Sequence, residues 1–325
     1  DIWDWDMPSA PILADITVDG KAIKAVAAPT KQNFLYVFDR TNGKPVWPIV
    51  ETPVPKGDLP GEWYSPTQPI PSKPPAFGRQ GITEKDLLDF TPELKAKTVE
   101  FMKNYRYGGL YEAPSEVMAN GTKGTIQLPG STGGPNWPGG SIDPESNIVY
   151  IYSKDEPALV AMMKDPKRSN MDYIAGGSEG AGRLVIDNLP VIRPPWGQIS
   201  AIDLNKGEIL WQAVHGETAD EVKNHPALKG VTIPRTGRQG RIGVLVTKSL
   251  LIAGEGGFVT TPQGRGAYLR AYDKATGADI GQVYMPAPQT GSPMTYMLDG
   301  KQYITVAISG PGYSGELLTF RLPNN

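Results

Sequence analysis

The amino-acid sequence predicts an all-β fold made of short antiparallel strands joined by tight turns. Three observations support this prediction. The 325 residues include 38 glycines and 32 prolines without a collagen-like period, an excess that many tight turns would explain. A turn motif recurs three times along the chain, and a hairpin recurs near both of its ends.

The turn motif places a glycine four positions after an aspartate and a tryptophan eight positions after it. An aspartate can accept backbone N–H bonds in a turn, and a glycine can take the positive φ that closes a hairpin. A tryptophan on the next strand can pack against a neighbouring sheet. The three units are Asp39, Gly43 and Trp47; Asp203, Gly207 and Trp211; and Asp273 and Gly277, with Gly281 in place of the tryptophan.

The hairpin repeat relates PILADITVDGKAIKAVAAP to SPMTYMLDGKQYITVAIS. In each segment an Asp-Gly-Lys turn, at 19–21 and at 299–301, separates two alternating strands. The next strands, LYVFDR (35–40) and LLTFRL (317–322), also match. A unit of about four strands therefore recurs, which predicts a β-propeller of four-stranded antiparallel blades. We expect one propeller domain over residues 1–325, with about four or five blades.

Two long segments, at about 48–128 and 154–195, interrupt this pattern and are expected to be insertions on one rim. The first begins with a proline-rich excursion and continues into a helical insertion near 84–105. Thr91 is its expected N-cap and Pro92 its first residue. The second insertion is glycine-rich, and we expect a loop with little regular structure. The expected buried face of the helix carries Leu94, Thr98, Phe101, Met102 and Tyr105.

Composition excludes several classes of function. A formal net charge of −2 gives no reason to expect a nucleic-acid partner. The absence of cysteine excludes disulfides, thiolate metal sites and cysteine nucleophiles within these residues. The two histidines, His215 and His225, lie in a polar stretch and are expected to be solvated loop residues. A Ser-His-Asp hydrolase or a histidine-rich metal centre therefore has little support.

The segment DIWDWD at the beginning of the chain is the first candidate site. In a strand, Asp4 and Asp6 would point to one side, and Trp3 and Trp5 to the other. Two carboxylates on one side can bind a divalent cation, or one of them can act as a base whose pKa its neighbour tunes. The alternative is a strand end with solvated acids.

A single lysine, Lys31 in APTKQNFLYVFD, precedes an apolar strand in a stretch with few other charges. Such a lysine can pair with a carboxylate or with an anionic ligand. It can also extend its ammonium group to water at a sheet edge. The residues alone leave both alternatives open.

The densest glycine cluster, GSTGGPNWPGGSIDPES (130–146), holds Asn136 and Trp137 between prolines and glycines. Such a loop allows the close approach of a ligand. Neither this loop nor GEGGFVTTPQGRG (254–266) has the glycine spacing of a nucleotide-binding loop between a strand and a helix. Nucleotide binding is therefore not expected.

Together these segments resemble the pyrroloquinoline-quinone (PQQ) dehydrogenases, and among them the membrane-type glucose and quinate dehydrogenases. The matching stretches run in order from the first residue nearly to the last. They are DIWDWDMPSAPILADI, APTKQNFLYVFDRTNGKPVWPI, PGEWYSPTQPIPSKPP, GGPNWPGGSIDP, PPWGQISAIDL and GSPMTYMLDGKQYITVA.

The resemblance implies a fold and a role for each candidate residue. The family fold is an eight-bladed propeller that carries PQQ on its axis beside Ca²⁺ or Mg²⁺. Asp4 corresponds to the base that takes the substrate hydroxyl proton while hydride moves to the quinone. Lys31 corresponds to the cation at the quinone oxygens, and Asp6 resembles an extra metal ligand of some branches. Asn136 and Trp137 fall in the loop that closes on the edge of the cofactor.

The resemblance also implies partners. The main metal ligands and the residues that stack on PQQ come from the N-terminal half of the family's propeller, and this chain matches the C-terminal half. We therefore expect the N-terminal half, or a second chain, to complete the ring. The same resemblance implies a sugar or alcohol substrate and a quinone or cytochrome c electron acceptor. It also implies a periplasmic location, either free or attached to the inner membrane.

Three classes of function are compared. The first is a quinoprotein dehydrogenase that oxidises a sugar, polyol or alcohol hydroxyl. The second is a non-catalytic propeller scaffold, or an incomplete fragment, that lacks the cofactor. The third is a carbohydrate-cleaving propeller that uses Asp4 and Asp6. Because a scaffold needs neither Asp4 nor Lys31, the presence of both in their motifs favours the dehydrogenase.

Overall fold

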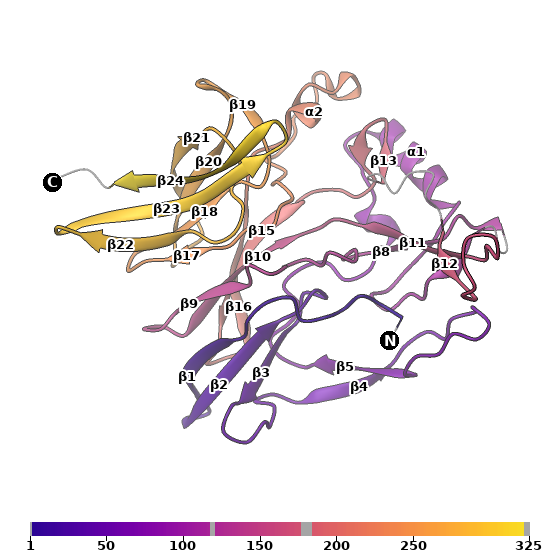
Figure 1. Ribbon diagram of the computed structural model, residues 1–325, viewed down its shortest axis with the longest axis horizontal. Coiled ribbons are helices and arrows are strands. Elements are labelled where there is room, and N and C mark those ends of the chain that lie inside the picture. Colours follow the sequence, from indigo (N-terminus) through magenta and orange to yellow (C-terminus); the bar gives the residue numbers. More distant parts are fainter. Residues whose placement is uncertain (1, 118–120, 177–183, 322–325) are drawn as a thin grey trace.

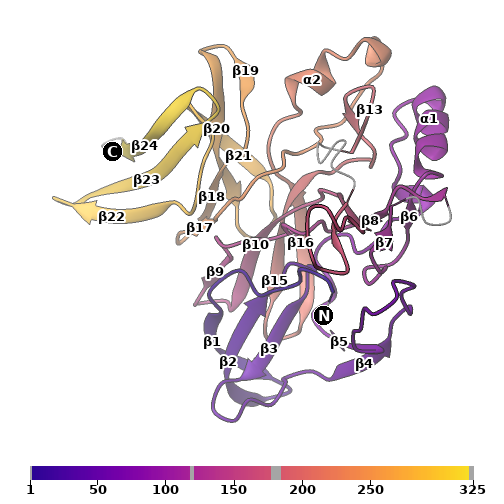
Figure 2. The same cartoon turned by 45° about the vertical axis from the view of Figure 1, so that its right-hand side comes forward.

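Four antiparallel sheets follow one another in a row in the computed structural model, which describes residues 2–117, 121–176 and 184–321 (Figures 1 and 2). Each sheet packs on the next one along the chain, as in the blades of a propeller. The four sheets consist of β1 (Ile12–Val18), β2 (Lys21–Pro29) and β3 (Leu35–Asp39); β9 (Gly140–Asp143), β10 (Ile148–Lys154), β15 (Gly197–Asp203) and β16 (Glu208–Val214); β17 (Leu245–Val246), β18 (Leu250–Gly254), β19 (Val259–Thr261), β20 (Gly264–Asp273) and β21 (Asp279–Met285); and β22 (Met294–Leu298), β23 (Lys301–Gly310) and β24 (Tyr313–Arg321).

The predicted hairpin repeat is confirmed in the first and last of these sheets. The turn between β1 and β2 has Asp19 at φ 50° and Gly20 at φ 77°, and the turn between β22 and β23 has Asp299 at φ 50° and Gly300 at φ 71°. Positive φ at both central residues is the condition for a type I′ turn, which matches the twist of the flanking strands. Both sheets then continue into a third antiparallel strand, β3 or β24.

The three predicted aspartate–glycine turns also form. The amide N–H groups of Gly43, Gly207 and Gly277 each donate to the aspartate carbonyl four residues earlier, at 2.8 Å. All three glycines have a φ between 66° and 73°, which a side chain would disfavour. The aspartate carboxylates accept a further backbone N–H two residues on, at 2.8–3.0 Å.

In the two units that have a tryptophan, its ring packs on the turn glycine of the next sheet. A Cβ added to Gly207 would lie 2.9 Å from the ring of Trp47, and one added to Gly277 would lie 2.5 Å from the ring of Trp211. Trp211 also donates from Nε1 to the Lys274 carbonyl, at 3.2 Å. The motif therefore joins consecutive sheets. Its glycine is required because the turn has a positive φ and because the tryptophan ring occupies the space that a Cβ would need.

The insertions lie together on one side of the row of sheets (Figure 1). The predicted helix is present as α1 (Pro92–Met102), and Thr91 Oγ1 accepts from the Leu94 amide at 3.2 Å. Neither α1 nor any other helix in the described residues is long and apolar enough to cross a membrane. The remaining elements of this side are β4 (Ile49–Pro53), β5 (Thr67–Pro71), η1 (Glu84–Asp86), β6 (Arg106–Tyr107), β7 (Ser115–Glu116), β8 (Thr125–Gln127), β11 (Ala158–Met163), β12 (Ile174–Ala175), β13 (Val185–Ile186), β14 (Leu189–Pro190), α2 (Asp220–Lys223) and η3 (Pro226–Leu228).

The second insertion is more regular than the sequence predicted. Strand β11 pairs with β8 of the first insertion, with Ala158 opposite Gln127 and Val160 opposite Thr125. The alternation of small and apolar residues in ALVAMM (158–163) is compatible with a strand, but its partner lies more than 30 residues away in the sequence. Most of the glycine-rich run GGSEGAG lies outside the described residues.

His215 is not the solvated loop residue that the sequence predicted. It is fully buried, with Nδ1 2.8 Å from the Tyr272 hydroxyl and Nε2 3.0 Å from the Gly254 carbonyl. Burial lowers its pKa to about 4, so the imidazole is neutral at pH 7. His225 is half-buried, and its Nε2 lies 2.6 Å from the Asp187 carbonyl oxygen. The sequence around both histidines is polar. They differ in that His215 directly follows strand β16 (Glu208–Val214), whereas His225 does not follow a strand.

Gly277→Ala is expected to destabilise the protein by about 2–3 kcal/mol. The substitution combines a positive φ, which costs about 1–2 kcal/mol, with a clash against Trp211. Urea unfolding followed by circular dichroism measures the change. Gly281→Ala is the matched control, because a Cβ at Gly281 meets no atom within 4 Å and its φ is not in the left-handed region. Equal effects of the two substitutions would contradict the role of the glycine contact.

Candidate active site

Asp4, Asp6 and Lys31 form a three-charge cluster at one end of the first sheet. The Lys31 ammonium donates to Asp4 Oδ1 at 2.7 Å and forms a second ion pair with Asp6 Oδ1. The Lys31 side chain is 9% exposed, whereas each aspartate side chain is 59% exposed. The cluster therefore has a buried cation and two carboxylates that remain open to a ligand.

The contacts within the cluster shift the pKa values of Asp6 and Lys31. The hydrogen bond from Lys31 is the main cause that lowers the pKa of Asp6 below its usual value. Burial alone would lower the pKa of Lys31, but its hydrogen bonds to Asp4 and Asp6 and the charges of both carboxylates raise that pKa. At neutral pH Asp6 is therefore ionised and Lys31 is protonated.

Trp3 fixes the position of the aspartates. Its Nε1 donates to the Glu112 carbonyl at 2.9 Å, and its ring makes edge contacts with Tyr64 at 4.8 Å and Tyr111 at 5.2 Å between centroids. The segment is not a regular strand, yet both aspartates reach the same ammonium group, as expected from the alternation. Trp5 is half-buried, and its Nε1 has no hydrogen-bond partner among the described residues.

Lys31 lies in a tight loop between β2 and β3. The Thr30 amide donates to the Phe34 carbonyl at 2.9 Å, and the Asn33 amide donates to the Thr30 carbonyl at 3.0 Å. Asn33 takes a φ of 70°, a value that asparagine tolerates better than most residues. The loop directs the lysine back toward the N-terminal segment.

The glycine loop of residues 130–139 lies against the Lys31 loop. The Gly134 amide donates to the Lys31 carbonyl at 3.0 Å, and a Cβ at Gly133 would lie 2.8 Å from the Lys31 Cα. Asn136 uses its side-chain amide within the loop, donating to the Thr132 carbonyl at 2.6 Å and accepting from the Trp137 amide at 2.9 Å. Trp137 is 53% exposed.

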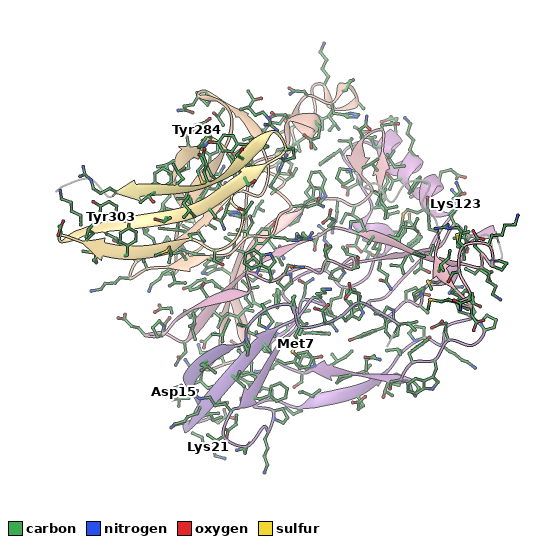
Figure 3. The ribbon with its side chains drawn as sticks, in the orientation of Figure 1. Met7, Asp15, Lys21, Lys123, Tyr284 and Tyr303 are labelled. Atoms are coloured by element: carbon green, nitrogen blue, oxygen red, sulfur yellow. The ribbon has the colours of Figure 1, made fainter. Side chains whose placement is uncertain are left out.

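The structure thus brings Asp4, Asp6 and Lys31 into direct contact and places Asn136 and Trp137 on the adjoining loop. Among the hydrogen bonds and ion pairs of the described residues, none joins Asn136 or Trp137 to the three-charge cluster. Met7, which follows Asp6, lies at the opposite end of the first sheet from Lys21 (Figure 3). The cluster is therefore on the side away from the β1–β2 turn.

Sequence reasoning missed Lys154, which lies on the far side of the glycine loop. Its amide donates to the Gly134 carbonyl at 3.1 Å, and its ammonium group, on a side chain 7% exposed, pairs with Glu156. The sequence feature that could have indicated Lys154 is its position as a single lysine at the end of the apolar strand IVYIYSK. This pattern resembles that of Lys31, but Lys154 has no matching family motif.

The chemistry of the cluster fits one part of a PQQ site. Lys31 is a fixed cation of the type that an electron-rich quinone oxygen requires, and the Trp5 indole N–H is a further free donor. Asp4 and Asp6 carry carboxylate oxygens of the kind that Ca²⁺ or Mg²⁺ prefers, and such an ion needs six or more oxygen ligands. No group of three histidines or acidic residues suited to a metal occurs in the described part of the chain. Further metal ligands would have to come from other residues.

Comparisons with known proteins agree with this fit. Residues 1–304 match the family profile described as PQQ glucose/ethanol/alcohol dehydrogenase, beta-propeller domain. A probable quinate dehydrogenase (quinone) of Xanthomonas campestris pv. juglandis is 32% identical over 354 residues, and the quinoprotein glucose dehydrogenase A of Acinetobacter calcoaceticus is 31% identical over 350 residues. Both alignments cover 100% of this chain and 42% of the relative.

The crystal structure of the quinohemoprotein alcohol dehydrogenase from Comamonas testosteroni has a TM-score of 0.52 to this chain, at 20% identity. That alignment covers 99% of this chain and 39% of the other, and it supports the propeller fold. The chain spans about two fifths of the length of the relatives that it matches. The predicted resemblance to glucose and quinate dehydrogenases is confirmed. The chain belongs to the β-propeller family of PQQ-dependent glucose, ethanol and alcohol dehydrogenases.

Proposed function

We propose that this chain supplies the substrate base and the quinone-binding cation for PQQ-dependent oxidation of a sugar, polyol or alcohol hydroxyl. The observation that supports this proposal is the contact of the open Asp4 carboxylate with the buried Lys31 ammonium. A base and an electrostatic stabiliser within one hydrogen bond of each other can act on one reacting hydroxyl. The family membership of the chain supports the same chemistry.

Each residue has a separate task in this proposal. Asp4 accepts the proton of the substrate hydroxyl at its free carboxylate oxygen, and Lys31 holds Asp4 in place and stabilises negative charge beside it. When bound, PQQ supplies the quinone that accepts the hydride from the substrate carbon. Trp137, exposed on the rigid glycine loop, provides a surface for the edge of the cofactor, and Asn136 maintains that loop.

A Ca²⁺ or Mg²⁺ ion at Asp6 is part of the same proposal. The carboxylate of Asp6 is open and has a lowered pKa, so it is ionised and available to a hard cation across the physiological pH range. A divalent cation would also offset the net negative charge of the three-charge cluster. The remaining ligands would come from the part of the ring that this chain does not supply.

The outer face of the last sheet supports a partner that completes the ring. Cross-strand register places Met294, Tyr296, Leu298 and Leu317 on one face, and they are 38–76% exposed. The opposite face, with Ile304 and Val306, packs on the preceding sheet. Several large exposed apolar residues on one sheet face are typical of an interaction surface. The N-terminal half of a propeller, or a second chain, is the partner that we propose.

The relatives extend the proposal to an acceptor and a location. The names of two relatives describe a quinone-dependent quinate dehydrogenase and a quinate/shikimate dehydrogenase (quinone). A quinone is therefore the acceptor that we propose first, with cytochrome c as the alternative. We also propose a periplasmic location, which rests on the resemblance alone.

The competing function is a propeller scaffold without cofactor. A titration of the purified chain with PQQ and Ca²⁺, alone and together with the proposed N-terminal half, separates the two. Absorbance reports PQQ binding, and reduction of a dye reports turnover of glucose or quinate. Binding and turnover support the dehydrogenase. Their absence from a folded, fully assembled ring would support the scaffold.

Asp4→Asn is expected to lower turnover of the assembled, PQQ-loaded protein by about 10²- to 10⁴-fold, because the base is lost. Absorbance titration should show nearly unchanged PQQ binding, since Lys31 remains. Asp15→Asn is the control, because Asp15 is an exposed aspartate in β1, ion-paired with Arg40 and away from the three-charge cluster. Full turnover of the Asp4→Asn protein would refute the assignment of the base.

Lys31→Met is expected to weaken PQQ binding and slow turnover. It should also remove a pH-dependent part of the stability. The lowered pKa of Asp6 contributes stability above its usual value of 3.8, which is lost as the pH falls through the folded-state pKa. The raised pKa of Lys31 contributes stability that is fully present below pH 10.5. This stability is lost as the pH rises through the folded-state pKa of Lys31.

The unfolding free energies of the wild type and of Lys31→Met should therefore differ most between about pH 5 and pH 10. Urea unfolding at a series of pH values gives the difference. A difference that does not change from pH 2 to pH 11 would show that the ion pairs add nothing to stability.

Leu317→Lys is expected to reduce self-association of the isolated chain and to weaken its assembly with the N-terminal half, because it places a charge in the exposed apolar face. Sedimentation velocity measures both effects. Met171→Lys is the control, since Met171 is 69% exposed in the second insertion. Association that is unaffected by Leu317→Lys would place the interface elsewhere.

A further inference from the structure

The segment of residues 77–80, in the first insertion, lies against the Lys31 loop, and we call it the brace. The Phe77 amide donates to the Asn33 carbonyl at 3.0 Å. The Asn33 side-chain amide in turn donates to the Arg79 carbonyl at 3.2 Å. The brace is therefore bonded to the backbone and to the side chain of a residue that lies two positions after the lysine.

The side chain of Asn33 is enclosed between the brace and the glycine loop. It belongs to a fully buried residue. A Cβ added to Gly78 would lie 2.5 Å from its Nδ2, and one added to Gly134 would lie 1.8 Å from its Oδ1. Gln80 Nε2 also donates to the Gln32 carbonyl, at 2.7 Å. The Lys31 loop therefore has little room to move while the brace and the glycine loop stay in place.

The brace is attached to the second sheet at Phe77. The Phe77 carbonyl accepts three hydrogen bonds, from Gln198 Nε2 at 2.9 Å, from Ser200 Oγ at 3.2 Å and from Gln212 Nε2 at 2.9 Å. The residue is fully buried in the core between the first and second sheets. These contacts fix one end of the brace on β15 and β16.

An ion pair attaches the brace to the second sheet at another point. Arg79 Nε lies 3.0 Å from Asp155 Oδ2, and the two side chains are 18% and 5% exposed. The Arg79 guanidinium also donates from Nη1 to the Arg193 carbonyl at 2.7 Å and from Nη2 to the Pro195 carbonyl at 3.3 Å. Asp155 directly follows Lys154, whose amide holds the glycine loop. The end of β10 thus contacts both segments that enclose the Lys31 loop.

Stability alone does not account for this ion pair. Burial raises the pKa of Asp155 to about 6, even though Arg79 favours the ionised form. Asp155 Oδ1 has no hydrogen-bond partner among the described residues. A buried carboxylate of this kind costs free energy, and an apolar pair of similar volume is often at least as stable. The ion pair does, however, fix the direction of the guanidinium and with it the course of the brace.

We propose that Arg79 and Asp155 are positioning residues, which hold the Lys31 ammonium group at Asp4 by fixing the Lys31 loop through the brace. This inference rests on the proposed function, in which Lys31 is the quinone-binding cation. Among the described residues, no hydrogen bond or ion pair joins Arg79 or Asp155 to the three-charge cluster, so both act through the brace. Displacement of a catalytic group by about 1 Å is enough to slow a reaction strongly.

A second ion pair of similar burial provides a matched control. Lys274 Nζ lies 2.6 Å from Asp143 Oδ2, and the two side chains are 18% and 7% exposed. This pair joins the second sheet to the third at the turn-bearing end of the blades. No hydrogen bond or ion pair of these two side chains, within the described part of the chain, reaches the brace or the Lys31 loop. Its loss should therefore lower stability without moving Lys31.

The first test labels the lysines of the full chain, without PQQ, with an acetylating N-hydroxysuccinimide ester at pH 8. Asp155 is ionised at this pH. Mass spectrometry gives the rate at each lysine, and the exposed Lys21 is the internal reference. Lys31 should react slowly in the wild type, because its ammonium group is buried and paired. Asp155→Asn should raise that rate about tenfold, and Asp143→Asn should leave it unchanged.

Arg79→Met should raise the Lys31 rate as Asp155→Asn does, and Arg79→Lys, which keeps a cation opposite the carboxylate, should restore most of the protection. Circular dichroism checks that each variant is folded. A wild-type Lys31 rate in folded Asp155→Asn protein would overturn the proposal. An equal rise in Asp143→Asn would overturn it too, since it would show general loosening. If Arg79→Met does not fold, the nearly isosteric Asp155→Asn decides.

The second test uses the assembled protein. Asp155→Asn should weaken PQQ binding about tenfold in an absorbance titration and lower kcat about tenfold, whereas Asp143→Asn should change neither. Unchanged PQQ binding by Asp155→Asn, beside a wild type that binds PQQ, would overturn the positioning role while the dehydrogenase function stands. If the wild type binds no PQQ and turns over no alcohol, the proposed function fails. The labelling result then still decides whether Arg79 and Asp155 position Lys31.

Discussion

The contact of a tryptophan with the turn glycine of the next sheet determines how consecutive blades are spaced. Trp47 reaches Gly207, and Trp211 reaches Gly277, so the same contact joins the first sheet to the second and the second to the third. Each glycine would clash with the ring if it carried a Cβ. Because these contacts set the sheets side by side, they also bring the Lys31 loop of the first sheet against the glycine loop that leads into the second. The site therefore depends on the packing at the opposite, turn-bearing end of the blades.

Charge at the site is arranged so that the cation is buried and the anions are open. Removing an ammonium group from water is costly unless a carboxylate pairs with it, and Lys31 has two such partners. The aspartates, in contrast, keep more than half of their surface. An arrangement that served stability alone would gain little from ion pairs whose carboxylates are mostly exposed to water. It is more consistent with a surface prepared for a substrate hydroxyl, a metal ion and an anionic cofactor.

Local patterns predicted much of the fold. Some features depend only on residues that are neighbours in the sequence, so the sequence alone can predict them. They are the turns at Asp39, Asp203 and Asp273 and the helix cap at Thr91. The residues alone left two environments open for Lys31, a charged partner or water at a sheet edge, and the family resemblance assigned Asp4 and Lys31 to one site without predicting their direct contact. The burial of His215 and the β8–β11 pairing depend on contacts between distant segments, which composition does not encode.

In the proposed function, the three-charge cluster and the last sheet both need groups that these residues do not supply. The cluster has a net negative charge and two carboxylates, which cannot by themselves complete the shell of a hard cation. The last sheet has one face packed on its neighbour and one apolar face in water. The proposed metal site at the three-charge cluster needs further oxygen ligands. The exposed face of the last sheet needs an apolar sheet face to cover it. A further set of propeller blades would supply both at once, because the blades that cover an outer sheet also carry loops to the common axis. One partner that supplies both the metal ligands and the covering sheet is therefore a simpler proposal than two independent partners.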